Sequence, residues 1–254
     1  MALTAKSLFL YGLQVTPNNS SIDFKISGGG SELRATLTLG YYSLTDLMAE
    51  VKTAMQKADP THVYTVTADR TLNGGTENRV TITTNGVFLS LLFASGSRAV
   101  SSAAGLLGFT ATDKTGSTTY TGTLSAGTVL IPTLVGYNYL STDHSRKVFG
   151  SLNISTTGEK EAIVFQVQQF FQVQFKFEPA VKVSSEWTPL LTWMIQQKAL
   201  EFTPEITSPN TFYVCTLEKS PADGKGLGYT VKEQLPQFPT LYDIGLMTYR
   251  KKVT

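Results

Sequence analysis

The segment 163–178 constrains the fold of this chain more than any other part of the sequence. Every second residue in it, starting at position 163, is apolar apart from Gln169, and from Gln166 on the intervening residues are polar apart from Phe170. Strict alternation of this kind is the pattern of a β-strand with one buried face. A strand of about 16 residues spans roughly 50 Å, whereas most strands have about 5–6 residues. The segment therefore predicts a strand that either bends at a bulge and serves two sheets or extends beyond the body of one subunit.

The polar face of this predicted strand consists mostly of neutral glutamines. Glutamine both donates and accepts hydrogen bonds, so such a face suits a wet interface between subunits. A helix is expected to follow, with Thr188 as its cap and Pro189 at its first position, and Trp187 and Trp193 flank this helix. We interpret the tryptophans as core or interface anchors rather than as ligand platforms. The predicted subunit interface contains six residues: Gln166, Gln168, Gln172, Gln174, Trp187 and Trp193.

The low charge of the chain also favours association with partners. Charged residues make up 16% of the sequence, compared with roughly 25% in an average soluble domain. Hydrophobic residues make up 41%, which is enough to build a core and excludes global disorder. A surface with so few charges is poorly protected against association, so we expect much of it to be covered by other subunits.

The charge balance and the hydropathy pattern exclude two classes of partner. The net charge is only +2, so the chain lacks the basic excess that neutralises nucleic-acid phosphates. No apolar stretch approaches 18 residues, and the amino terminus lacks the apolar region of a secretory signal. We expect a soluble protein made in the cytoplasm, with no membrane anchor and no specific nucleic-acid binding.

The first third of the chain is typical of a small α/β module. Residues 33–39 alternate as a strand does, and residues 44–58 carry an apolar stripe at helical spacing. Ser43 stands at the capping position of this helix, and Asp59 precedes a proline that ends it.

A hairpin and a second helix are expected after this module's first helix. The alternating runs 63–67 and 79–83 flank Asn73-Gly74, which is a strong hairpin signal. Residues 101–109 predict a short helix that ends at Gly108 as a left-handed cap.

We predict a mainly β fold with two to three helices (α+β). A small amino-terminal α+β module, 1–112, is followed by a polar loop or linker, 113–128, and then by a β-rich assembly domain, 129–254, with one packing helix. This second domain is expected to resemble a β-sandwich or barrel and to close with a hairpin of residues 212–217 and 227–231.

Residues for catalysis are scarce in the sequence. The two histidines, His62 and His144, stand apart in a helix-strand connection and in a polar turn, with no metal-binding spacing. Cys215 is the only cysteine and lies in an apolar alternating run, as a core residue does. We therefore predict a protein that is not an enzyme, with no catalytic residues, no cofactor and no metal.

Several short motifs resemble a module seen in structural proteins of tailed-bacteriophage particles. The resemblance covers about residues 30–110 and rests on four stretches. They are Gly40–Leu47 with the following helix, the paired strands Tyr64–Val66 and Val80–Thr83, and Leu106–Phe109. The resemblance implies a virion component, often one of the tail, baseplate or fibre-attachment parts.

Our first hypothesis is a non-enzymatic structural component of a bacteriophage virion, made in the host cytoplasm. It would form a ring at the tail tip or baseplate or in association with the tail tube. Its partners would be copies of itself and other virion structural proteins, with DNA passing nearby but not specifically bound. The alternatives are a capsid decoration or minor head protein and a carbohydrate-binding or cell-wall-hydrolysing protein, the latter because exposed tyrosines such as Tyr41, Tyr42, Tyr137 and Tyr139 are able to stack on sugars.

Overall fold

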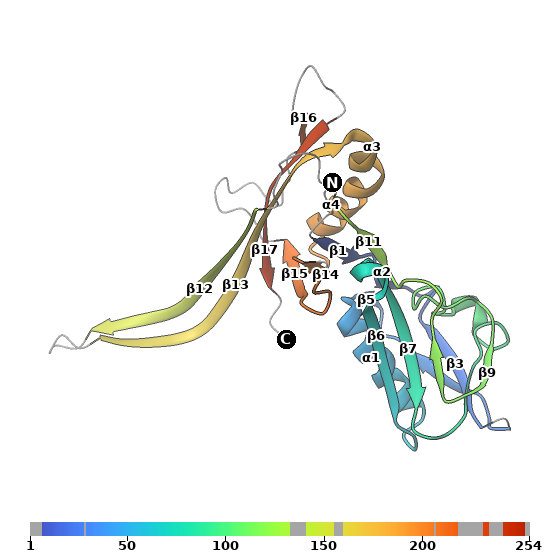
Figure 1. Ribbon diagram of the computed structural model, residues 1–254. Helices are drawn as coiled ribbons and strands as arrows, with labels where there is room; N and C mark the ends of the chain where they lie inside the picture. The colour runs from blue at the N-terminus through green and yellow to red at the C-terminus, as the bar shows by residue number, and fades with distance from the viewer. Residues whose placement is uncertain are drawn as a thin grey trace. The chain divides into compact units, whose positions relative to one another are not determined.

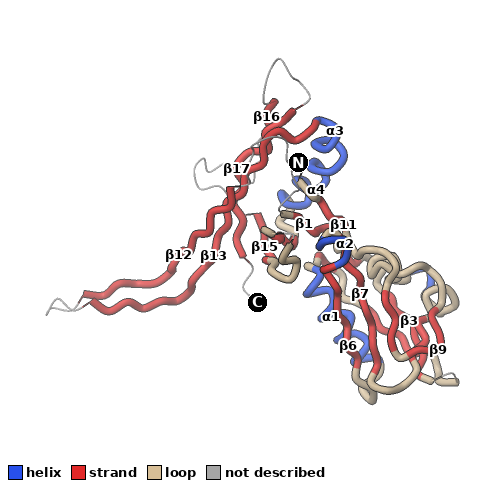
Figure 2. Tube along the Cα trace, in the orientation of Figure 1, coloured by secondary structure: helices blue, strands red, loops and turns tan. Residues whose placement is uncertain are grey.

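The computed structural model describes residues 7–27, 29–132, 141–154, 160–205, 207–217, 231–233 and 241–251. They fall into two compact units, whose elements are labelled in Figure 1 and coloured by type in Figure 2. The amino-terminal unit consists of Ser7–Ile131 and Lys198–Phe212. The carboxy-terminal unit contains the described residues of 132–197 and 213–254. We call Lys198–Phe212 the returning segment, because its chain neighbours on both sides belong to the other unit.

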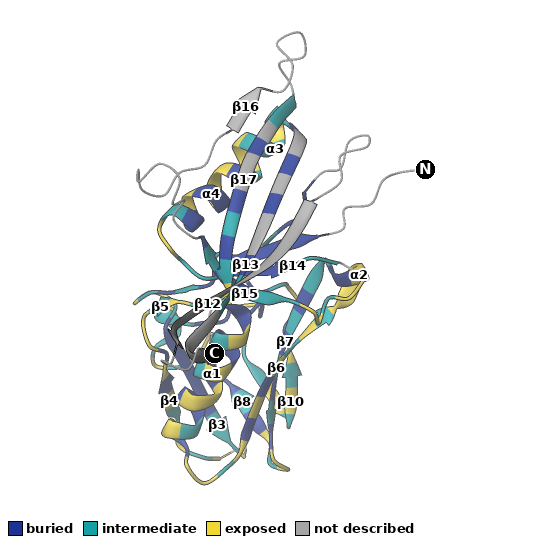
Figure 3. Ribbon diagram, turned by 90° about the vertical axis from the view of Figure 1, so that its left-hand side faces the viewer, coloured by how far each residue is buried: buried dark blue, intermediate teal, exposed yellow. Residues whose placement is uncertain are grey.

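Helix α1 (Leu44–Ala58) of the amino-terminal unit begins and ends where the sequence predicts. The Ser43 hydroxyl accepts a hydrogen bond of 3.0 Å from the Asp46 amide, which satisfies one of the free donors of the first turn. Asp59 ends the helix in an extended conformation (φ −137°, ψ 93°), since the residue before a proline avoids the α region. Exposed residues line the outer side of α1 in Figure 3, so the helix covers the core with its apolar stripe.

The predicted hairpin is formed by β6 (Tyr64–Thr71) and β7 (Glu77–Thr84), and β10 (Thr119–Thr121) adds a third antiparallel strand. The strands β6 and β7 are joined by the turn α2 (Leu72–Gly75). Asn73 and Gly74 have positive φ angles of 47° and 67° in this turn, which is why an Asn-Gly pair suits it.

A second sheet of the same unit has the strand order β4–β3–β8–β9. Its strands are β3 (Ser21–Ile26), β4 (Leu33–Thr36), β8 (Leu89–Leu91) and β9 (Lys114–Ser117). The buried Asp23 carboxylate of β3 accepts hydrogen bonds from the Arg98 backbone amide at 2.6 Å and from its guanidinium at 2.8 and 2.9 Å. This ion pair fixes the loop that contains the 3-10 turn η1 (Ala99–Ser101).

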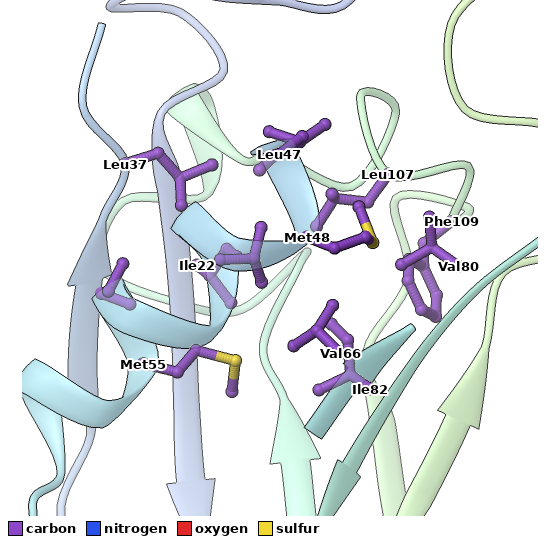
Figure 4. Close-up of a cluster of buried hydrophobic side chains, with 14 of the residues drawn as sticks. Ile22, Leu37, Leu47, Met48, Met55, Val66, Val80, Ile82, Leu107 and Phe109 are labelled. Atoms are coloured by element: carbon purple, nitrogen blue, oxygen red, sulfur yellow. The ribbon is translucent and has the colours of Figure 1, made fainter. Parts of the chain in front are cut away.

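The core of the amino-terminal unit lies between α1 and these sheets. Figure 4 shows Met48 and Met55 of α1 in one cluster with Ile22 of β3, Val66 of β6 and Ile82 of β7. All are buried, and truncating a buried aliphatic residue to alanine costs about 2–5 kcal/mol. The alternating pattern of the strands and the helical stripe therefore meet in a single apolar cluster.

The returning segment contributes β14 (Leu200–Thr203) to a further antiparallel sheet of the amino-terminal unit. In it β1 (Leu8–Tyr11) lies between β11 (Thr128–Leu130) and β14. Phe9 stands opposite Phe202, and their ring centroids are 5.1 Å apart. The short strands β2 (Gln14–Val15) and β5 (Gly40–Tyr41) also pair with each other.

The carboxy-terminal unit contains an antiparallel sheet with the order β15–β17–β13–β12, in which β16 also pairs with β17. Its strands are β12 (Ser141–Ile154), β13 (Lys160–Pro179), β15 (Tyr213–Leu217), β16 (Val231–Glu233) and β17 (Leu241–Lys251). Along β13 the side chains of Phe170, Val173 and Phe175 are buried, so this part of the strand faces a core.

Strand β13 contains a bulge, as one of the predicted alternatives requires, but it belongs to a single sheet. Its register with β12 shifts between the pairs Phe149–Gln166 and Gly150–Val164, which leaves Phe165 as a bulge. Its pairing with β17 starts only at Phe170, so the first half of β13 pairs with β12 alone among the described residues. Figure 1 shows β12 and β13 continuing as a two-stranded ribbon past the end of β17.

A continuous helical stretch follows β13 and covers the sheet of its unit. It consists of α3 (Ala180–Lys182), the π turn η2 (Val183–Trp187) and α4 (Thr188–Ile195). The predicted cap at Thr188 is wrong, because this residue is itself helical and its hydroxyl donates to the Val183 carbonyl at 2.8 Å. The π turn precedes Pro189, and wider turns of this kind are one way in which a helix tolerates a proline.

The predicted fold class, mainly β with a few helices and a β-rich part with a flanking helix, is confirmed. The division of the chain lies elsewhere than predicted. Residues 113–128 belong to the amino-terminal unit, where β9 pairs with β8 and β10 pairs with β7. The first stretch of this unit ends at Ile131. A polar composition marked residues 113–128 as a linker, but threonine and serine also suit exposed strands.

Two local predictions differ from the structure, and a third falls mostly outside the described residues. Residues 101–109 form a turn rather than a helix, in which the Leu107 amide bonds to the Ala103 carbonyl at 3.0 Å, although Gly108 is left-handed (φ 74°) as expected. Strand β15 pairs with β17, and the other arm of the predicted closing hairpin, 227–231, lies outside the described residues except for Val231. His144 lies in β12 instead of a turn.

Candidate functional site

The buried carboxylate of Glu201 is the centre of the most elaborate polar cluster of the amino-terminal unit. Glu201 lies on β14 opposite Leu10 of β1, and only 2% of its side chain is exposed. Its Oε1 atom accepts hydrogen bonds from the backbone amide of Thr45 at 3.0 Å and from the Thr45 hydroxyl at 3.2 Å. Because Thr45 is in the first turn of α1, the carboxylate lies at the positive end of the helix.

Arg70 neutralises Glu201 and links it to a second residue of the returning segment. Its Nε atom donates to Oε2 at 3.2 Å, and its Nη2 atom donates to both carboxylate oxygens at 3.2 Å. The same Nη2 atom donates to the Thr45 hydroxyl at 3.1 Å. The guanidinium carbon lies 4.1 Å from the ring centroid of Phe212, a cation–π arrangement. We call Thr45, Arg70, Glu201 and Phe212 the Glu201 junction.

The local sequence accounts for this geometry. Ser43 caps α1, and this leaves the Thr45 amide of the first turn available to Glu201. Arg70 stands near the end of β6, and the planar guanidinium fork matches the two oxygens of a carboxylate. A buried carboxylate is tolerated only when it is paired and hydrogen-bonded, and Glu201 meets both conditions.

A small, partly open pocket lies beside the Glu201 junction. Its wall includes apolar residues of β1 and its neighbours as well as Arg70 and Glu77. Both charges are already compensated, because Arg70 binds Glu201 and Glu77 accepts a 2.7 Å hydrogen bond from Arg79. The pocket therefore presents no unbalanced charge to a ligand. The hydrogen bonds and the ion pair of the junction instead hold β14, β6 and α1 together.

Asp59, His62 and Tyr64 form the second cluster of titratable groups. His62 Nδ1 lies 2.7 Å from Asp59 Oδ2, and the Tyr64 hydroxyl donates to the same oxygen at 2.7 Å. Burial alone would raise the pKa of Asp59, but hydrogen bonds from the Thr61 hydroxyl, Tyr64, His62 and the Thr61 amide outweigh it and hold the pKa well below its usual range. Burial and the adjacent carboxylate raise the pKa of Tyr64 far above its ordinary value.

The Asp59 cluster has the base and the orienting acid of a catalytic triad but not its nucleophile. In a triad the nucleophilic hydroxyl bonds to the ring nitrogen opposite the carboxylate. Here the Thr61 hydroxyl lies 2.9 Å from Nδ1, the nitrogen that already faces Asp59. Within the described part of the chain the cluster closes the end of α1, and we interpret it as structural.

The predicted interface residues do not form one cluster in the described structure. Gln166, Gln172 and Gln174 lie on β13, but their side chains are outside the described set, whereas Gln168 is half-buried. Trp187 is fully buried and its ring centroid lies 4.9 Å from that of Phe175, and Trp193 is also buried. Burial within one unit favours packing inside the subunit for both tryptophans, and the role of the glutamines stays a prediction.

Sequence reasoning missed the Glu201 junction, because its members lie far apart in the chain. One signal was present: Glu201 stands between Leu200 and Phe202, in a short run where an acidic residue needs a partner if the strand is buried. The sequence contains several arginines and thus gave no means of choosing Arg70.

The described residues include no group of three or more histidine, cysteine, aspartate or glutamate side chains arranged to hold a metal ion. In the same residues, no helix combines the length and apolar character needed to cross a membrane. Comparisons with protein-family models and with curated proteins gave no match.

Proposed function

We propose that this chain is a non-enzymatic structural subunit that assembles with copies of itself in a tailed-bacteriophage virion, at the tail tip or baseplate or with the tail tube. The observation that carries the proposal is the distal ribbon, which we define as residues 146–154 of β12 and 160–169 of β13. Both strands have register partners only in each other over this length, among the described residues.

A ribbon of this kind needs further contacts to be stable. An isolated two-stranded hairpin is marginally stable in water, and three or more strands or a packed layer are needed for independent stability. Strand β12 also leaves one edge without a neighbour among the described strands. Such an edge is a ready template for pairing with another chain.

The residue types of the ribbon fit a protein partner. Natural edge strands are commonly protected by charged residues. Here the charged residues are confined to the ends of the ribbon strands, at Arg146, Lys147, Lys160 and Glu161, and residues 148–154 and 162–169 contain none. Directly opposite positions include Val148 with Val167 and Leu152 with Ala162, so the register brings apolar residue types together. These features support a ribbon that becomes covered on assembly.

The virion location is supported by the resemblance of residues 30–110 to a module of phage structural proteins. The part of the chain that carries the resemblance forms α1 against the β6–β7 hairpin. A capsid decoration or minor head protein would use the same ribbon, so the location in the particle separates these two alternatives.

The first experiment tests assembly directly. Arg146 and Gln169 are register partners, so a variant in which Asn-Gly joins them removes the ribbon and keeps a suitable hairpin turn. Light scattering and electron microscopy of the full chain should show a multimer, and the shortened variant should remain a folded monomer. The control replaces only residues 155–159 with glycine and serine and should still assemble. Equal assembly of the shortened variant would contradict the role of the ribbon.

The second experiment tests location. Immunogold labelling of purified particles with an antibody to this chain should mark the tail end. Label over the head would favour the decoration alternative. Absence of label, together with absence of the protein from particle mass spectra, would overturn the virion assignment.

A further inference from the structure

The returning segment occupies an unusual position in the chain. Its residues complete the amino-terminal unit, yet the residues before and after it belong to the carboxy-terminal unit. The connections are short: β14 starts four residues after Gln196, the residue that follows α4, and β15 starts directly after Phe212. The returning segment therefore contributes a strand to the amino-terminal unit, although it is joined at both ends to the carboxy-terminal unit.

The connection before β14 is strained. Gln197 has a φ angle of 57°, in the left-handed region that only glycine adopts without cost. Its side-chain amide also donates to the Leu217 carbonyl at 2.7 Å, which holds this residue to the carboxy-terminal unit. Short hinges under strain favour exchange of the element that follows them between copies of a protein, because the open form relieves the strain.

The receiving surface is specific for this one strand. β14 pairs with β1 in a fixed register, with Leu8 opposite Thr203, and Phe202 packs against Phe9. The Glu201 junction adds a buried polar contact that is satisfied only when Glu201 reaches Arg70. A buried ion pair of this kind can specify register. The same strand from another copy makes identical contacts, so exchange costs none of them.

We propose that the returning segment is exchanged between subunits, so that β14 of one copy pairs with β1 of its neighbour. This inference rests on the proposed assembly of several copies and states how they are linked. Each copy gives one strand and receives one, and such a head-to-tail connection closes into a ring when the rotation permits. Subunits linked in this way separate only when β14 is withdrawn and the Glu201 junction opens.

Disulfide trapping tests the exchange in the full chain. Cys215 is the only cysteine and is replaced by alanine, and the pair Leu8→Cys and Thr203→Cys is then introduced. Directly opposite residues of an antiparallel pair have Cα atoms about 4.5–5.5 Å apart, within the range that a disulfide spans. The pair Phe9→Cys and Phe202→Cys serves as a second variant, should the first fail to fold.

The readout is the mass of the oxidised chain on a denaturing, non-reducing gel, together with the native mass from light scattering. Exchange predicts covalent multimers. A control pair, Tyr11→Cys and Thr128→Cys, joins β1 to β11 inside Ser7–Ile131 and should leave single chains. A multimer in solution whose oxidised chains run singly would overturn the exchange and leave the assembly standing. A protein that is monomeric in solution with single oxidised chains would overturn both.

A second experiment tests the contribution of the left-handed conformation at Gln197. Gln197→Gly relieves the left-handed strain in the unexchanged chain, so the fraction of covalent multimers should fall several-fold. Gln196→Gly is the matched control, since Gln196 has a φ angle of −76° and carries no such strain. An unchanged multimer fraction in Gln197→Gly would overturn the role of the strained hinge.

Discussion

Arg70 contacts the returning segment near both of its ends, because it binds Glu201 through its guanidinium edge and covers the ring of Phe212 with its guanidinium face. Glu201 lies 131 positions from Arg70 in the chain. One side chain of β6 thus fixes a segment that would otherwise be joined to the amino-terminal unit only by strand pairing and apolar contacts.

Replacing Glu201 with glutamine should destabilise the amino-terminal unit. Breaking a buried ion pair by removing one partner leaves an uncompensated charge and typically costs about 3–5 kcal/mol; we expect the lower end, because Arg70 keeps some contact with solvent. Both tryptophans lie in the carboxy-terminal unit, so urea unfolding followed by tryptophan fluorescence reports that unit. Far-ultraviolet circular dichroism reports both units.

The expected result for Glu201→Gln is an earlier circular-dichroism transition with an unchanged fluorescence transition. Glu205→Gln is the matched control on the same segment, where the carboxylate accepts a 3.2 Å hydrogen bond from the exposed Thr207 hydroxyl. It should change stability by less than about 0.5 kcal/mol. Equal effects of the two substitutions would contradict the importance of the junction.

Replacing Ser43 with alanine should weaken the start of α1. The substitution removes the acceptor for the Asp46 amide, and loss of such a cap costs about 1 kcal/mol. The measurement is urea unfolding by circular dichroism. Ser43→Asp keeps a capping oxygen and should stay close to the parent protein, whereas a loss as large as that of alanine would argue against capping.

The Asp59 cluster should make the amino-terminal unit sensitive to acid. Because the folded-state pKa of Asp59 is lowered, its stabilising contribution is present above the unfolded pKa of about 3.9 and is lost as the pH falls toward the folded pKa. Thr61→Val removes the hydroxyl that contributes most to this lowering, so the stabilising contribution of Asp59 should be smaller and its loss should be complete at a higher pH.

The measurement is the free energy of unfolding between about pH 6 and pH 2. Asp59→Asn should be less stable than the parent at pH 6 and should show a smaller decrease toward acid. Parallel curves for the parent protein and Asp59→Asn would show that this carboxylate does not contribute to the acid sensitivity.

A shortened chain that ends at Ile131 should be unstable, because it lacks β14 and leaves the edge of β1 and the Arg70 guanidinium without their partners. A peptide of residues 198–212 should restore structure when added in trans, with a gain in thermal stability that rises with peptide concentration. The control peptide carries Glu201→Gln and should bind more weakly by about tenfold or more. Equal stabilisation by both peptides would contradict the proposed contribution of the ion pair.

Local signals in the sequence predicted the parts of the fold that depend on neighbouring residues. The bounds of α1 follow from Ser43 and from the proline after Asp59, and the β6–β7 hairpin follows from Asn73-Gly74. Both rest on backbone preferences that act within a few residues.

Pairing between distant segments was not predictable in the same way. The partners of β14 and β15 are β1 and β17, and no local preference selects one alternating strand over another. The junction between Arg70 and Glu201 forms only after β14 has found β1, so it depends on this pairing. For the same reason, amino-acid composition did not predict the unit boundary after Ile131.

The position of the returning segment also determines when the amino-terminal unit can be completed during translation. A ribosome makes Ser7–Ile131 first, but it must translate a further stretch up to Phe212 before the last strand of that unit exists. At about 5–20 residues per second, the nascent unit waits for several seconds with its β1 edge open. On a transcript read by many ribosomes at once, β14 from a neighbouring chain can arrive before the chain's own, and the order of translation then influences which copies become linked.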